Sequence, residues 1–245
     1  MIPIHDDNKA ERTFPFVNYL LIVINVLAFL YELSLSHDQL QRLILRYGAI
    51  PAELSHNVTL VPGAPHPIYL TIFTAMFLHA GWLHIGGNML YLWIFGDNVE
   101  DAFGHVKYLI FYLLGGVAAA LCQTYVGGPN SSSPMIGASG AIAAVLGAYI
   151  LLFPKGLVRV LIFLGILILP IRLPAIIVIG FWILLQVWTG VASLGVHTAQ
   201  SGGVAVWAHV GGFALGILTV WIFRDRDNVQ RQRSLRSGYK AFDRW

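Results

Sequence analysis

The chain has 245 residues, of which 57% are hydrophobic and only 11% are charged, whereas ordinary soluble domains carry about 25% charged residues. Several apolar runs approach the roughly 20 residues that a helix needs to span a hydrocarbon core about 30 Å thick. This composition excludes an ordinary soluble domain and predicts a multi-pass integral membrane protein in a lipid bilayer. The net charge of +3 arises from basic residues at helix ends and in the tail, so no nucleic-acid partner is expected.

Cysteine usage and the N-terminal residues narrow the class further. The single cysteine, Cys122, excludes an intramolecular disulfide and provides no metal cluster, so neither a metal nor a cofactor is expected. Residues 1–14 are polar, with acidic side chains where the basic region of a cleavable signal belongs. We interpret them as a cytosolic N-terminal segment.

The apolar runs predict six membrane helices. They cover about residues 16–31, 83–99, 106–126, 137–153, 174–190 and 203–223. Helical apolar spacing over residues 38–46 predicts a short amphipathic helix at the interface, and the Pro/Gly-rich residues 61–67 predict a loop. The expected fold class is an all-α membrane protein with a six-helix membrane domain over residues 15–224.

The segment between the fourth and fifth spans is apolar for longer than one helix needs. Pro170, Arg172 and Pro174 interrupt it, so residues 157–170 are interpreted as a hydrophobic, partly interfacial connection. A further span there would send the tail, residues 225–245, to the outer side with its positive charges. We interpret this tail as basic and cytosolic.

Basic residues indicate the orientation. With six spans, 13 of the 15 Lys and Arg residues lie on the side of the termini, and only Arg42 and Arg46 lie on the other side. Because cytosolic loops carry an excess of Lys and Arg, both termini are predicted to be cytosolic.

Four polar side chains stand out in the predicted spans: His84, Asn88, Ser139 and His209. Polar groups at membrane depth are costly and need partners, although any one of them alone is more often structural glue between helices. At 1.5 Å per residue, Ser139 and His209 each lie about 21 Å above the cytosolic end of their span. His84 and Asn88 lie about 24 Å and 18 Å above the same boundary. Side chains from three helices therefore fall in one layer beneath the outer surface.

This layer has the chemistry of an acyl-transfer site. A serine hydroxyl needs a base within hydrogen-bond reach, and a neutral histidine such as His209 provides one. Asn88, His84 and the backbone N–H of Ser139 offer donors for an oxyanion, and the first two share a helix face at i, i+4. No Asp or Glu lies in the last three spans, so Ser139 and His209 would form a dyad.

Stripes of small residues flank both members of the dyad and predict close helix packing. They are Ala208, Gly212 and Gly216 beside His209, and Gly140, Ala144 and Ala148 beside Ser139. Other chemistries fit less well. The chain has no His-Glu-x-x-His motif, no aspartate pair at mid-membrane, and no last glycine for a G-x-S-x-G elbow around Ser139. His79 and His84 are poorly aligned as metal ligands, and His79 is expected to be structural, hydrogen-bonded within its loop.

The motifs resemble those of the rhomboid family of intramembrane serine proteases. They are His79-Ala-Gly-Trp-Leu-His84-Ile-Gly-Gly-Asn88, Glu100-Asp-Ala-Phe-Gly-His-Val-Lys-Tyr-Leu-Ile-Phe-Tyr-Leu113, Gly137-Ala-Ser139-Gly140 and Ala208-His209-Val-Gly-Gly212-Phe-Ala-Leu-Gly216. The similarity covers about residues 16–224. It implies a six-helix rhomboid fold with a cavity that opens to the outer side.

The resemblance also implies roles. Ser139 would be the nucleophile, His209 the general base, and Asn88 and His84 the oxyanion donors. Substrates would be transmembrane proteins that enter laterally past the fifth helix, and a loop at about 190–202 would cap the site. The expected location is a bacterial inner membrane. Many relatives carry an aromatic residue one turn after the serine, which stacks on the histidine, whereas this chain has Ala143. The sequence does not indicate what orients His209.

The expected function is that of an intramembrane serine endopeptidase. The alternative is a catalytically silent rhomboid-like protein that binds client membrane proteins. A small-solute transporter or channel fits less well, because paired buried charges and an evident internal repeat are lacking.

Overall fold

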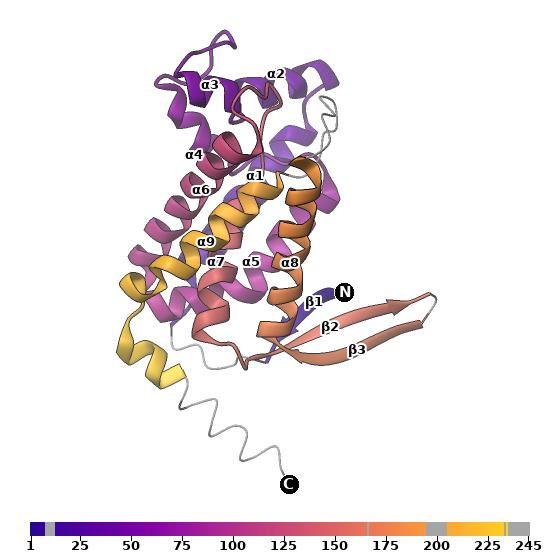
Figure 1. The fold of residues 1–245 in the computed structure, drawn as a ribbon, viewed down its shortest axis with the longest axis vertical. Helices are drawn as coiled ribbons and strands as arrows, with labels where there is room; N and C mark the ends of the chain where they lie inside the picture. Colours follow the sequence, from indigo (N-terminus) through magenta and orange to yellow (C-terminus); the bar gives the residue numbers. More distant parts are fainter. Residues whose placement is uncertain (8–12, 166, 195–204, 233, 235–245) are drawn as a thin grey trace.

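The computed structural model describes residues 1–7, 13–165, 167–194, 205–232 and 234, and it is mostly helical (Figure 1). The helices are α1 (Phe16–Leu33), α2 (His37–Tyr47), α3 (Pro51–His56), α4 (Thr71–Ala75), α5 (Trp82–Phe103), α6 (His105–Gly127), α7 (Ser139–Leu152), α8 (Ala175–Leu194) and α9 (Val206–Phe223), with a 3₁₀ turn, η1, at Ile68–Leu70. The strands are β1 (Ile2–Asp6), β2 (Leu157–Leu164) and β3 (Leu167–Pro174).

The long helices coincide with the predicted spans to within a few residues. α1, α6, α8 and α9 are long and apolar enough to cross a membrane, so the chain is an integral membrane protein. α5 is long but carries several acidic residues towards its end. α7 has 14 residues, which corresponds to about 21 Å and is shorter than a hydrocarbon core. That all six predicted helices cross the membrane completely therefore stays a prediction.

α7 lies at the centre of the helical bundle. Its residues from Gly140 to Tyr149 are all buried, and α9 packs along it at very close range. A methyl group added at Gly212 or Gly216 would meet the backbone carbonyl of Gly140 or Ala144. Small residues therefore let the two backbones approach, which confirms the predicted stripes.

A small sheet, which the sequence analysis did not predict, lies at the end of α7 away from Ser139. Residues 157–174 form an antiparallel hairpin, and β1 pairs with β2 from the other side. The sequence is apolar on both faces of the hairpin, so no period-2 pattern marked it as strand. Gly165, with φ +66°, allows the tight turn between the two strands.

β1 is held to the helices by a buried carboxylate. Asp6 accepts hydrogen bonds from the Asn98 amide of α5, at 3.0 Å, and from the Tyr149 hydroxyl of α7, at 2.7 Å. At the base of the hairpin, Asp7 pairs with Arg159 at 3.0 Å and with Arg172 at 3.4 Å. The N-terminal segment, which was interpreted as polar and cytosolic, therefore joins the sheet to α5 and α7.

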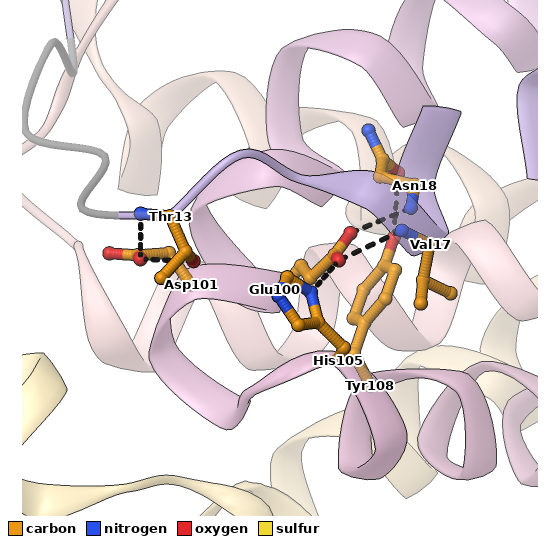
Figure 2. A network of polar contacts seen from close by, with 7 residues as sticks. All are labelled: Thr13, Val17, Asn18, Glu100, Asp101, His105 and Tyr108. Atoms are coloured by element: carbon orange, nitrogen blue, oxygen red, sulfur yellow. Dashed lines mark hydrogen bonds and ion pairs between the residues drawn. The ribbon is translucent and has the colours of Figure 1, made fainter. Parts of the chain in front are cut away.

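A second polar network fixes α5, the helix that carries His84 and Asn88 (Figure 2). The buried Glu100 carboxylate accepts the backbone N–H groups of Val17 and Asn18, at 2.9 and 2.6 Å, and contacts the His105 ring. A carboxylate at the N-terminus of α1 satisfies donors that have no partner within the helix. The Tyr108 hydroxyl donates to the Asn18 side chain at 2.8 Å, so α1, α5 and α6 are tied together.

The predicted amphipathic helix and loop are confirmed. α2 covers the expected residues and begins with a capping box at Ser36 and Gln39, and residues 61–67 have no regular structure. The short helix α3, between α2 and this loop, and the elements η1 and α4, after the loop, were not predicted. They lead the chain to the loop before α5.

Candidate active site

Ser139 is the first residue of α7 and one of the residues that line a small cavity. The cavity has a volume of about 50 Å³ and is lined mainly by small or apolar residues, among them Gly116, Ala119 and Ala208. Gly137, two residues before the serine, adopts φ +117°, a conformation that favours glycine. This turn leads into the helix, at whose start Ser139 is half-buried.

His209 reaches Ser139 from α9. Its Nε2 lies 2.8 Å from the Ser139 Oγ, which is hydrogen-bond distance. The His209 side chain is buried, with a residue exposure of 7%. The structure therefore brings together the two residues that the sequence analysis selected from separate spans.

His84 and Asn88 approach the same turn from α5. A methyl group added at Gly137 would lie 2.7 Å from the Cε1 and Nε2 atoms of His84 and 3.6 Å from Nδ2 of Asn88. The backbone N–H of Ala80 donates to His84 Nδ1 at 3.3 Å. Since a neutral imidazole has one donor and one acceptor nitrogen, Nε2 of His84 carries the proton and faces the turn.

Asn88 offers an unused donor at this turn. Its Nδ2 is buried and has no hydrogen-bond partner among the residues that the structure describes. A buried amide donor without a partner costs free energy, so its presence beside Gly137 suits a group that receives its partner from a bound molecule. His84 and Asn88 therefore lie beside the turn that leads into Ser139, to which His209 is hydrogen-bonded.

His79 lies in the loop before α5, next to His84. Its backbone N–H donates to the Glu32 carboxylate at 3.2 Å, and its buried ring packs edge-on against His84, with centroids 5.1 Å apart. Burial, and then the nearby His84, lower the pKa of His79 to about 4. The ring is therefore neutral at neutral pH and supports His84 by packing, as a structural residue of this loop.

Two residues of α8 that sequence reasoning missed contact His209. The Gln186 Oε1 lies 2.8 Å from His209 Nδ1. The Trp182 ring lies against the imidazole with centroids 5.5 Å apart and an interplanar angle of 42°. The sequence did contain a signal for Gln186, because it is an amide inside a largely apolar run and such residues need a partner.

Two further expectations concern other parts of the site. The loop that would cap it, at about 190–202, lies from residue 195 onward outside the described residues. Within the described ranges there is no group of three or more His, Cys, Asp or Glu side chains that could hold a metal ion.

Comparison with known proteins decides the family. Residues 67–226 match the family model of the rhomboid domain, which is more than half of the chain. The chain belongs to the rhomboid family. The fold that the motifs implied is thereby confirmed at the level of the family.

Curated rhomboid relatives resemble parts of this chain. Mitochondrial rhomboid protein 1 of Saccharomyces cerevisiae is 28% identical over 182 residues, which cover 71% of this chain and 47% of that protein. Rhomboid protease GluP of Bacillus subtilis is 31% identical over 55% of this chain and 24% of its own length. Rhomboid protease GlpG of Haemophilus influenzae is 39% identical over 29% of this chain and 34% of its own length. The chain thus spans about half or less of the length of each of these relatives.

Proposed function

We propose that this rhomboid is an intramembrane serine endopeptidase that cleaves transmembrane proteins in or near the bilayer. The observation that carries the proposal is the 2.8 Å contact between Ser139 Oγ and His209 Nε2, together with the buried Asn88 Nδ2 donor, which has no partner among the described residues. Support also comes from the two bacterial relatives whose names identify them as proteases. The proposed substrates are membrane proteins because His209 lies on α9, a helix of membrane length, and Ser139 lies on α7, which packs against α9.

The proposed reaction begins with attack of the Ser139 oxygen on the carbonyl carbon of the scissile peptide bond. The hydroxyl proton passes to Nε2 of His209. The carbonyl oxygen becomes an oxyanion that accepts hydrogen bonds from the Asn88 amide, the His84 Nε2–H and the backbone N–H of Ser139. These donors are held by α5 and by the start of α7, so they need little rearrangement.

Collapse of this intermediate breaks the carbon–nitrogen bond. The amine leaves with the proton that His209 had taken, and the acyl group stays as an ester on Ser139. A water molecule then gives a proton to His209 and attacks the ester. The second intermediate releases the carboxylic acid as the proton returns to the Ser139 oxygen. Each step uses the same base and the same donors, and no metal or cofactor is required.

The proposed orientation places both termini in the cytosol and the site towards the outer side. It rests on the 13-to-2 distribution of Lys and Arg under the positive-inside rule. The relatives include mitochondrial, chloroplastic and bacterial proteins, so a bacterial inner membrane stays a prediction. The same holds for residues 225–245 as a basic cytosolic tail.

Cleavage of a model transmembrane substrate in liposomes tests the function. We expect the wild type to cleave it, and we expect Ser139→Ala and His209→Ala to lower kcat by at least about 1,000-fold. Circular dichroism would establish that both variants remain folded. Cleavage that survives Ser139→Ala would overturn the mechanism. No cleavage by any form over a panel of substrates would instead favour the silent, client-binding alternative.

A further inference from the structure

The amide of Gln186 lies on the opposite edge of the His209 ring from Ser139. Its Oε1 is 2.8 Å from Nδ1, while Ser139 Oγ is 2.8 Å from Nε2. An amide oxygen only accepts, so Nδ1 carries the ring proton and Nε2 keeps the lone pair that faces the serine hydroxyl. We propose that Gln186 is a positioning residue that fixes the tautomer and the orientation of His209. This role rests on the proposed protease function.

Trp182 completes the support from the same helix. It precedes Gln186 by four residues and therefore lies on the same face of α8, where its ring packs 5.5 Å from the imidazole. Gln186 contacts the ring at its edge, and the Trp182 ring packs against it in a tilted arrangement. Ala143 of α7 is fully buried and provides no aromatic group. The orientation of His209 in this chain therefore comes from α8.

A purely structural role for Gln186 makes a different prediction. An amide in an apolar helix needs a hydrogen-bond partner in any case, and His209 satisfies it. If Gln186 only held α8 against α9, loss of its amide would weaken the fold but leave the tautomer of His209 unchanged. A positioning role changes the tautomer and the reactivity of Ser139 while the fold persists.

Because Gln186 lies on α8, the orientation of the proposed base, His209, depends on where α8 is placed. In the most apolar 18-residue stretch of each long helix, 22% of α8 is buried, against 33% of α1 and 39% of both α6 and α9. α8 is therefore the least enclosed of these four helices and has the fewest packing constraints on its position. Both contacts to His209 are lost when α8 moves away from α9, so an oriented base requires a docked α8.

Two measurements on the full chain in detergent test the proposal. The first is the rate at which a fluorophosphonate modifies Ser139, which reports nucleophile activation without a transmembrane substrate. Gln186→Leu removes the acceptor and is expected to slow modification about five- to tenfold, the equivalent of one hydrogen bond. Gln186→Glu restores an acceptor and is expected to stay within about twofold of the wild type. Thr189→Val, which removes a polar group one turn further along α8, is the matched control and should change nothing.

The second measurement is ¹⁵N NMR of histidine-labelled protein, with the His209 signals assigned by their loss in His209→Ala. We expect the protonated, pyrrole-type nitrogen of His209 at Nδ1 in the wild type and a mixture of tautomers in Gln186→Leu. A pyridine-type Nδ1 in the wild type would overturn the proposal, and so would wild-type modification rates in Gln186→Leu. The tautomer does not depend on proteolysis, so absence of cleavage by the wild type would contradict the proposed function but leave this test in place.

The β2–β3 hairpin provides an independent observation. No charged residue occurs from residue 160 to residue 171, and exposed apolar side chains gather towards the turn. They are Phe163, Leu167, Ile168 and Leu169, with exposures of 47, 53, 52 and 37%. Figure 1 shows the hairpin projecting sideways beyond the helices. It lies beside the C-terminal end of α7 and the N-terminal end of α8.

We infer that the hairpin tip lies in the lipid headgroup region at this end of the helices. α8 begins at Ala175, directly after β3, so the hairpin continues from a helix of membrane length. The charged cluster of Asp7, Arg159 and Arg172 stays at its base. Amphipathic elements bind at this depth by inserting apolar side chains. Within the part of the chain that the structure describes, no strand pairs with the outer edge of β3; this edge excludes the hydrocarbon centre, where free backbone groups are too costly.

Spin-label accessibility in liposomes tests this location. A nitroxide at Ile168→Cys in a Cys122→Ala background is compared with one at Ser132→Cys, an exposed loop position before α7. We expect the label at 168 to collide more with oxygen and less with a water-soluble nickel complex than the label at 132. Equal access to nickel would overturn the inference by placing the tip in water. Protection from both reagents would also overturn it, because the tip would then be covered by protein.

Discussion

Gly137 and His84 are so close that a methyl group added to the glycine would lie 2.7 Å from two atoms of the imidazole ring. Gly137 also has φ +117°, which other residues rarely adopt. Gly137→Ala is therefore expected to displace His84 from the turn before Ser139. Since one oxyanion donor is worth about 100- to 1,000-fold in kcat, cleavage should fall by at least about 100-fold.

Gly86→Ala is the matched control, because an added methyl group there meets nothing within 4 Å. It lies on α5, close to His84. Cleavage assays on both variants in liposomes check the prediction. Near wild-type cleavage by Gly137→Ala would contradict the placement of His84 in the oxyanion site.

Asn88→Ala is expected to separate activity from stability. The Asn88 Nδ2 has no partner among the described residues, so its removal relieves a buried, unsatisfied donor and should leave the free energy of unfolding equal or higher. In the reaction the same donor would meet the oxyanion, so kcat should fall about 100-fold or more. Thermal unfolding and cleavage are measured on the same preparation. A variant that loses stability and activity in parallel would indicate a structural role.

Gly216→Ala is expected to force α9 away from α7. The added methyl group would meet the backbone carbonyl of Ala144, and overpacking of this kind costs about 1–3 kcal/mol. His209 moves with α9, so modification of Ser139 by a fluorophosphonate should slow. Gly180→Ala on α8, where nothing lies within 4 Å, should leave both unfolding and modification unchanged. Unchanged modification in Gly216→Ala would show that α9 tolerates the displacement.

Glu100→Gln tests the network that ties α1 to α5. The carboxylate is fully buried and accepts the backbone N–H groups of Val17 and Asn18. Replacement by the neutral amide weakens these charge-assisted bonds and the interaction with the N-terminus of α1. We expect the free energy of unfolding to fall by about 1–3 kcal/mol, measured by detergent-induced unfolding. Asp227→Asn, at an exposed position, should change it by less than about 0.5 kcal/mol.

The helices could be predicted from the sequence because their signal is local. Each long apolar run satisfies its own backbone hydrogen bonds within the segment, so residues 16–31 or 106–126 indicate a helix without reference to any partner. The hairpin could not be predicted in this way. Its strands are apolar on both faces, which hides the period-2 pattern, and β1, the strand that pairs with β2, lies more than 150 positions earlier in the chain.

The candidate site also combines features that the sequence reveals locally with one that depends on long-range packing. Ser139, His209, Asn88 and His84 could be selected because polar side chains are costly in apolar spans and stand out there. Their common depth follows from the constant rise of a helix, which the sequence determines by itself. Gln186 carried the same signal, but its partner depends on how α8 is rotated against α9. That rotation is set by packing between helices far apart in the chain, so only the tertiary structure decided what orients His209.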